Sequence, residues 1–382
     1  MYDFEVLGAG PTGSYAANAL ARRGFSVHLV DPAEFPRNKL CGGGLTRKAL
    51  DLIRALEPSF DRTRLAEAVR DLYLFGPNGE TARTARLREG LVALVHRREF
   101  DAWWRERAVD AGAEFSHRPV GLDGARFLIA ADGAGSAWGK AIRGSFPNDE
   151  VAVTTECHTT GPSSAFAAIL LPPLGVSRGW GYSWLFGRSD GIVVGTGFRR
   201  DQSEDLLALR HRAVAAAHRF TTTDCSSFAN WIIPLYRLRP AARGRVALVG
   251  DALGTADPLF AEGIASGMAS AQVLVESFAH DHDFSGYPRA LLRHPYFRAM
   301  PYFAFLQHLW GADPTAAFEA LGSDRIFARL TRMLEEPLEA RTLVREFELR
   351  HPRQAWSNWR SFPGPPRGPD PGERRVGPTL FS

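Results

Sequence analysis

The sequence lacks any long uninterrupted apolar run. No stretch of its 382 residues approaches the roughly 18 uncharged apolar residues that cross a bilayer. We therefore expect at most peripheral membrane contact. Met1 leads directly into an apolar segment, without the basic region and small-residue cleavage site of a secretory signal, so no signal peptide is expected.

Cysteine is scarce and the net charge is small. Cys41, Cys157 and Cys225 are odd in number and show no Cys-x-x-Cys spacing, which predicts free thiols and a cytoplasmic location. The 46 basic and 42 acidic residues nearly cancel, so we expect no nucleic-acid partner. The histidines form no His-Glu-x-x-His or other paired spacing typical of metal ligands, and no metal is expected.

The chain is rich in strands that end at glycines. Residues 3–31 predict a strand, a glycine turn, an alanine-rich helix and a second strand. Residues 125–136 and 246–264 again pass from a buried strand into a glycine turn. From about 151 to 231, short β-rich runs separated by Pro, Gly and Ser indicate an antiparallel sheet, and an Asn-Gly hairpin within 71–87 is expected to add strands to it.

The first glycine turn has the pattern of a dinucleotide-binding loop. Gly8, Gly10 and Gly13, with Pro11 and Thr12 between them, follow the first strand and open the helix. Such glycines allow a tight turn, close approach of a pyrophosphate, and close helix packing. Asp31 ends the next strand, where a carboxylate accepts hydrogen bonds from ribose hydroxyls.

A later turn favours a flavin as the dinucleotide. Gly250 and Asp251 follow a buried strand, where the carboxylate can hold a ribityl chain. Pro258 precedes the Gly263–Ile264 turn, which opens a helix whose amides can face the flavin pyrimidine oxygen. The alternative is a tight turn with an exposed aspartate.

Several spaced motifs resemble a known family. They are "PRNKLCGGGL" at 36–45, "RREFD" at 97–101, "ADGAGS" at 131–136, "GYSWLF" at 181–186 and "GDALGTADPLFAEGI" at 250–264. Together with the first glycine turn they cover about residues 1–285, and the chain resembles the FAD-dependent geranylgeranyl reductases, which share the para-hydroxybenzoate hydroxylase fold.

The resemblance implies roles for particular residues. Arg37, Arg97 and Asp132 are expected to help hold FAD, Asp251 to bind its ribityl chain, and Cys41, Gly42, Gly43 and Gly44 to lie against the isoalloxazine. Cys41 is the candidate catalytic residue, as a proton relay or a positioning group. A buried cysteine is also commonly inert, and glycines also serve a plain loop.

Four aromatic residues recur at every second position, so a strand places Trp180, Tyr182, Trp184 and Phe186 on one face. They are expected to form the wall of an apolar substrate cavity, and the alternative is an ordinary sheet core. The chain departs from the family pattern at Gly187-Arg188, where "FP" plus a basic residue is usual, and at Ala261, where glycine is more frequent.

The predicted fold class is α/β, with a discontinuous Rossmann-like FAD domain, a mixed, mainly antiparallel β-sheet substrate domain and a C-terminal helical segment. We assign 1–68, 88–148 and 232–285 to the first domain, 69–87 and 149–231 to the second, 286–350 to the helices, and 351–382 to a flexible Pro/Gly/Arg-rich tail. The aromatic residues within 294–310 predict buried helix, with contact to a lipid surface as the alternative.

The expected activity is FAD-dependent reduction of C=C bonds in a prenyl lipid or a similar apolar substrate. With no second glycine fingerprint, the reductant is expected to be NAD(P)H at a shared or transient site, or a ferredoxin-type donor protein. The same fold permits an FAD-dependent monooxygenase acting on a small aromatic or a protein side chain. A flavin or prenyl-lipid carrier without turnover is the third possibility.

Overall fold

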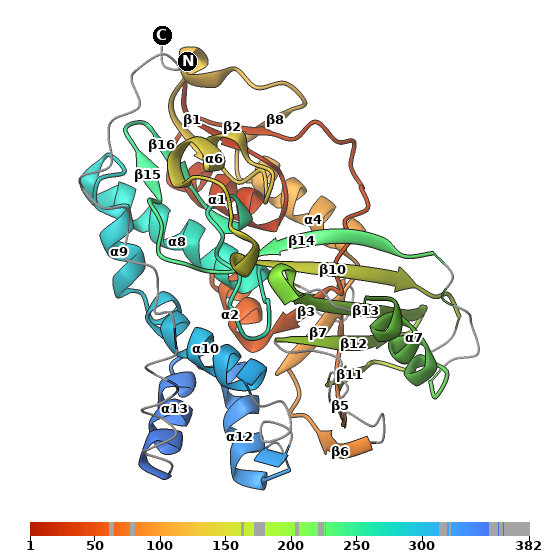
Figure 1. Ribbon diagram of the computed structural model, residues 1–382. Coiled ribbons are helices and arrows are strands. Elements are labelled where there is room, and N and C mark those ends of the chain that lie inside the picture. Colours follow the sequence, from red (N-terminus) through yellow and green to blue (C-terminus); the bar gives the residue numbers. More distant parts are fainter. Residues whose placement is uncertain are drawn as a thin grey trace.

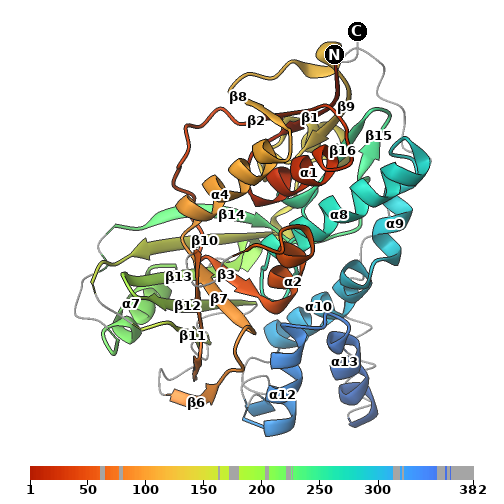
Figure 2. The ribbon, with the colours of Figure 1, turned by 180° about the vertical axis from the view of Figure 1, so that it is seen from behind.

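The computed structural model describes residues 1–60, 65–76, 81–161, 164–171, 180–202, 206–220, 225, 227–312, 319–320, 322–350, 358 and 362. Figures 1 and 2 show its helices and strands from two opposite sides. The predicted Asn-Gly turn at 78–79 lies outside the described residues, as does the predicted flexible tail apart from 358 and 362.

A six-stranded sheet takes its strands from three separate parts of the chain. Its order is β15 (Ala242–Arg243), β16 (Val246–Leu248), β9 (Ala125–Ala130), β1 (Tyr2–Leu7), β2 (Val27–Val30) and β8 (Glu114–Ser116). All pairs are parallel except β15 with β16. Helix α1 (Pro11–Ala21) packs between α4 (Arg97–Asp110) and α8 (Ile264–Asp281), as Figure 2 shows. The strand, helix and strand predicted over 3–31 are thus present.

A seven-stranded sheet lies beside it (Figure 1). Its order is β14 (Ala229–Pro234), β10 (Val151–His158), β13 (Gly191–Arg199), β12 (Gly181–Arg188), β11 (Phe166–Leu170), β5 (Asp71–Phe75) and β6 (Thr81–Arg86). Only β5 with β11 is a parallel pair. The excursion at 71–87 therefore does add strands to this sheet, and the predicted α/β class with a mixed sheet is confirmed.

The two faces of this sheet have different partners. Helix α7 (Leu206–Ala217) covers one face, where Ala168, Leu185 and Val194 are buried against it. Because side chains alternate along a strand, the neighbouring Trp184 and Phe186 point to the other face, toward the rest of the molecule.

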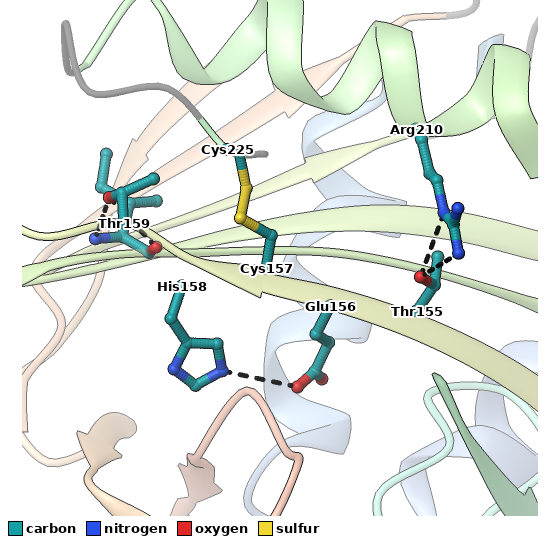
Figure 3. Close-up of a disulfide and its surroundings, with 8 residues drawn as sticks. Thr155, Glu156, Cys157, His158, Thr159, Arg210 and Cys225 are labelled. Carbon is teal, nitrogen blue, oxygen red and sulfur yellow. Dashed lines mark hydrogen bonds and ion pairs between the residues drawn. A yellow bond between two sulfur atoms is a disulfide. The ribbon is translucent and has the colours of Figure 1, made fainter. Parts of the chain in front are cut away.

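A disulfide joins the sheet to the α7 side. Cys157 on β10 is bonded to Cys225 (Figure 3). The expectation of three free thiols, on which the cytoplasmic location was based, is therefore wrong for two of them. Cys41 alone is free. Spacing along the sequence did not reveal this pair because 68 residues separate its members and the sheet brings them together.

The structure also contains a small sheet and several short helices. The small sheet is antiparallel and has the order β3 (Gly44–Thr46), β7 (Val92–Val95) and β4 (Ala66–Ala68). Helix α2 (Arg47–Leu56) directly follows β3 along the chain. Short helices are α5 (Gly121–Gly124), α6 (Ala137–Arg143), η1 (Asn148–Glu150), η2 (Arg200–Gln202) and η3 (Gly250–Ala252).

The C-terminal helices lie below the six-stranded sheet in Figure 1. They are α9 (Tyr287–Arg293), α10 (Pro295–Ala312), α12 (Asp324–Met333) and α13 (Glu339–Arg350). Aromatic side chains of α10, such as Phe303 and Phe305, are fully buried, which favours the buried interpretation of this segment. Arg83 on β6 pairs with Asp324 at 2.5 Å, so α12 is attached to the edge of the seven-stranded sheet. Within the described chain, no helix is both long and apolar enough to cross a membrane.

Candidate functional site

One cavity of about 880 Å³ is lined by both large sheets. Segments 37–44 and 259–264 and helices α10 and α12 complete its wall. All site residues predicted from the sequence line it except Gly13, Gly250 and Pro258, each of which is adjacent along the chain to a lining residue. The sequence motifs, dispersed over more than 250 residues, therefore converge on a single space.

The first glycine turn is shaped to admit a ligand. A Cβ on Gly8, whose φ is +96°, would lie 2.5 Å from the Ala131 carbonyl oxygen, and one on Gly13 would lie 1.9 Å from the Gly8 oxygen. A Cβ on Gly10 would meet only Arg37 Nη2, at 3.6 Å. Gly10 is also the N-cap of α1 and supplies no side-chain cap, so the helix amides are available to an anion beside it. The turn fits a pyrophosphate.

Asp31 and two arginines form a connected group at the end of β2. Ala9 N donates to Asp31 Oδ2 at 3.0 Å, and Arg37 Nη2 lies 3.5 Å from the same oxygen. Arg37 Nη1 is 3.2 Å from Asp101 Oδ2, and Arg97 donates to both Asp101 oxygens at 2.7 and 2.9 Å. Asp101 thus holds both guanidinium groups at the cavity wall.

The charge of Arg97 is maintained by its surroundings. Burial by itself lowers the pKa of the guanidinium, but Asp101 and the neighbouring Cys41 raise that pKa above its usual value. A permanently charged donor therefore lies beside the free thiol.

The glycine run at 42–44 has a packing reason of its own. A Cβ on Gly42 would lie 2.8 Å from Phe186 Cδ2, and one on Gly43, at φ +74°, would lie 2.1 Å from the Val95 oxygen. Gly43 N donates to Cys41 Sγ at 3.4 Å. Contacts within the protein already require Gly42 and Gly43, so the expected place of the run against an isoalloxazine stays a prediction.

Lys39 was not expected at the site. Its Nζ lies 3.3 Å from the centre of the Trp231 ring on β14, a cation–π contact. Burial lowers the pKa of Lys39 to about 8, and Arg97 adds to this, whereas Asp251 and Cys41 oppose it. The only hint in the sequence is its position two residues before Cys41.

Asp132 and Asp251 both line the cavity, and their expected contacts with FAD stay predictions. Burial raises the pKa of both carboxyls, and Lys39 and Arg97 oppose the shift at Asp251. Such carboxyls are suited to accepting hydrogen bonds from ligand hydroxyls.

The turn at 257–264 is held by the buried carboxylate of Asp257, which accepts several backbone hydrogen bonds. Asp257 accepts hydrogen bonds from Leu259 N at 3.0 Å, Phe260 N at 2.6 Å and Glu262 N at 3.1 Å. Burial raises the pKa of Asp257 to about 6, against the effect of Lys48. Ala261 adopts φ +53°, a left-handed conformation that favours glycine.

The aromatic strand contributes to this turn. Trp180 Nε1 donates to the Leu259 oxygen at 2.9 Å, and the Tyr182 hydroxyl donates to the Phe260 oxygen at 2.5 Å. The four aromatic side chains therefore divide: Trp180, directly before β12, and Tyr182 on β12 anchor the turn through their polar ends, while Trp184 and Phe186 pack against the glycine run.

A buried ion pair connects the turn to the glycine run. Lys48 Nζ, at the start of α2, lies 2.8 Å from Glu262 Oε2, and Thr46 donates to the other carboxylate oxygen. Both charged side chains are less than a tenth exposed. The pair fixes segment 41–48 relative to the turn.

Helices α10 and α12 cover the far part of the cavity, which sequence patterns did not indicate. Trp310, Phe327 and Leu330 line it opposite the aliphatic Leu74 and Ile169 of the sheet. The apolar side chains of α12 lie on one face, but a pattern within one helix does not show which distant sheet that face packs against.

Comparison with known proteins is consistent with this geometry. A family model described as an NAD(P)-binding Rossmann-like domain matches residues 6–38. A menaquinone reductase of Mycolicibacterium smegmatis is 29% identical over 72% of this chain and 75% of its own length. A digeranylgeranylglycerophospholipid reductase of Methanopyrus kandleri is 32% identical, covering 55% of this chain and 61% of that protein. A 35% identical protein of Methanosarcina barkeri aligns over only 28% of its length.

Solved structures share the fold. A geranylgeranyl bacteriochlorophyll reductase-like protein of Thermoplasma acidophilum superposes with a TM-score of 0.69, at 20% identity, over 94% of this chain and 99% of that one. A flavin-dependent brominase gives 0.70 at 17% identity, over 92% and 100%. The expected fold of flavin-dependent reductases and monooxygenases is confirmed.

Proposed function

We propose that this chain, a relative of the geranylgeranyl reductases, is a flavin-dependent oxidoreductase that reduces C=C bonds of a prenyl lipid or a similar apolar substrate. The observation that carries the proposal is the single cavity, which joins the dinucleotide-binding residues to a wall of aromatic and aliphatic side chains. Relatives named as reductases of prenyl compounds support the reaction type.

FAD fits the residues at one part of this cavity. The open Gly10 backbone and the α1 N-terminus would receive its pyrophosphate, Asp31 its ribose, and Asp251 its ribityl chain. The glycine run at 42–44 and the turn at 258–264 would border its ring system. Once reduced, bound FAD supplies the hydride.

The protein would have to align an alkene that offers no carbonyl for developing charge. Walls from β12, β11 and α12 can hold an apolar chain in one register and exclude water. Trp180 and Tyr182 fix the turn to β12, so that the two sides of the reaction space keep a constant separation.

Cys41 is proposed to carry or position the proton that completes the reduction. Its Sγ lies at the cavity wall between Gly43 N and the charged Arg97. NAD(P)H at a shared or transient site, or a ferredoxin-type protein, would supply the electrons.

The decisive experiment is anaerobic. The purified, FAD-loaded protein, chemically reduced, is mixed with a geranylgeranyl lipid, and the lipid mass is followed. A gain of two hydrogens per double bond without oxygen supports the reductase. Substrate-dependent oxygen uptake, with oxygen incorporated into an aromatic compound, would instead support the monooxygenase.

A further inference from the structure

Strand β10 carries a carboxylate on the apolar face of the cavity. Thr154 and Glu156 line the cavity together with Ala152, at alternate positions. Figure 3 shows Thr155 and Cys157 on the opposite side, where Arg210 donates to Thr155 Oγ1 at 2.7 and 3.1 Å and Cys225 forms the disulfide. These two attachments fix the strand, and Glu156 is thereby held toward the cavity.

Glu156 has an unused hydrogen-bonding atom. The residue is 4% exposed, and its buried Oε2 has no hydrogen-bond partner in the part of the chain that the structure describes. His158 Nε2 is 3.8 Å from Oε2, beyond hydrogen-bonding distance. A buried acceptor without a donor is costly, so such an atom in a cavity wall calls for a donor on a ligand.

Strand β12, two places from β10 in the sheet, provides an unused donor. Trp184 Nε1 is buried and has no hydrogen-bond partner among the described residues. In the sheet register Glu156 is opposite Gly195, and Gly195 is opposite Trp184. A Cβ on Gly195 would lie 2.4 Å from Trp184 Nε1, so the indole N–H is directly above this glycine.

Strand β13 lies between β10 and β12. Directly opposite residues of an antiparallel pair have Cβ positions about 5 Å apart, so the Cβ positions of Glu156 and Trp184 are about two such steps apart. The middle position is Gly195, which has no side chain, and the indole of Trp184 extends over it. The acceptor of Glu156 and the donor of Trp184 therefore border the same small region of the cavity.

We propose that Glu156 and Trp184 together bind a neutral hydroxyl group on the apolar substrate. The hydroxyl donates to Glu156 Oε2 and accepts from the Trp184 indole N–H, which satisfies both atoms at once. The inference rests on the proposed function and narrows its substrate class to prenyl compounds that carry an alcohol or phenol. An ether leaves the carboxylate unpaired, and a diphosphate brings negative charge against it.

Binding without turnover tests this assignment. Isothermal titration calorimetry is carried out on the oxidised, FAD-loaded protein, without reductant, using geranylgeraniol, its methyl ether and geranylgeranyl diphosphate. The alcohol is expected to bind at least about tenfold more tightly than the ether, because a hydrogen bond to a charged group is lost in the ether. Equal affinities, or tighter binding of the diphosphate, would overturn the proposal, and this comparison needs no variant.

Two variants test whether Glu156 accepts the hydrogen bond from the substrate hydroxyl and whether Trp184 donates one to it. E156Q, whose amide can donate to an ether, is expected to reduce the alcohol preference to within about twofold. W184F removes the donor that both ligands use, and should weaken both by a similar factor while keeping the preference. The matched control E114Q changes a glutamate on β8, outside the cavity wall, and should behave as wild type. A preference that survives E156Q would refute the role of Glu156.

The result is independent of the test of function. If the alcohol preference is found but no alkene is reduced, the proposed reaction fails and the hydroxyl site stands. If the alkene is reduced without any alcohol preference, only the hydroxyl site is refuted.

Discussion

Replacement of Gly195 by alanine tests the packing of the aromatic wall. An added Cβ would lie 2.1 Å from Trp184 Cε2 and 2.2 Å from Cζ2, far inside the separations that real Cβ atoms show. The indole has little room to move, because the Gly42 backbone also lies against it, where a Cβ would be 3.0 Å from Nε1. Overpacking of this kind costs about 1–3 kcal/mol. We therefore expect G195A to lower the free energy of unfolding by that amount.

Urea unfolding followed by tryptophan fluorescence and by circular dichroism measures the effect. The matched control is G135A, because a Cβ on Gly135 has no neighbour within 4 Å, and a change within about 0.5 kcal/mol is expected there. The cost of G195A should largely disappear in a W184A background, since the clashing ring is gone. If G195A is as harmless as G135A in the wild-type background, the packing argument is refuted.

Four further predictions follow from the same contacts. A261G should raise the free energy of unfolding by about 1 kcal/mol in urea unfolding, because glycine has no penalty at φ +53°, and a loss of stability would contradict this. C41A should lower the rate of alkene reduction by about 10²-fold with FAD absorbance unchanged, and full activity would remove Cys41 from the mechanism. In the oxidised protein, Lys39 should titrate near pH 8 in NMR of 13C-methylated lysines. Because this pKa is below its value of 10.5 in the unfolded chain, the free energy of unfolding relative to K39M should fall as pH decreases from about 10.5 to 8. A Lys39 signal that titrates above pH 10 would contradict both the lowered pKa and the pH dependence of stability. K48M should destabilise the fold by about 3–5 kcal/mol in urea unfolding, because Glu262 is left as a buried unpaired charge, and an unchanged midpoint would show that the pair is dispensable.

Local patterns predicted the elements whose signal lies within a few residues. The β1–α1–β2 unit follows from an apolar run, three spaced glycines and alanine-rich helical spacing, and it is present as expected. The alternation from Trp180 to Phe186 likewise predicted one shared face, and all four residues line the cavity. In both cases the period of the backbone determines the outcome, with little contribution from distant contacts.

Features that depend on distant partners were not predictable. Cys157 gave no sign that Cys225 would lie beside it, and the free-thiol prediction failed there. Glu156 was overlooked because "VAVTTECHT" mixes polar and apolar residues on both faces. Only the register with Gly195 and the attachment of Cys157 and Thr155 to the opposite side reveal that this carboxylate faces the cavity.

The structure shows a second role for the glycines of the site, in packing against Trp184. The sequence suggested that the run after Cys41 allows a flat cofactor to approach, and that small residues on β13 merely fill a strand. In the fold, Gly42, Gly195 and Gly197 all lie against the Trp184 indole, where their Cβ atoms would lie 3.0, 2.1 and 3.2 Å from that side chain. The glycine run, the aromatic strand and the Gly-x-Gly of β13 therefore form one packing unit around this indole. A change in any of the three segments should be tolerated only with a compensating change in another, because the ring leaves little space for a side chain at any of these glycines.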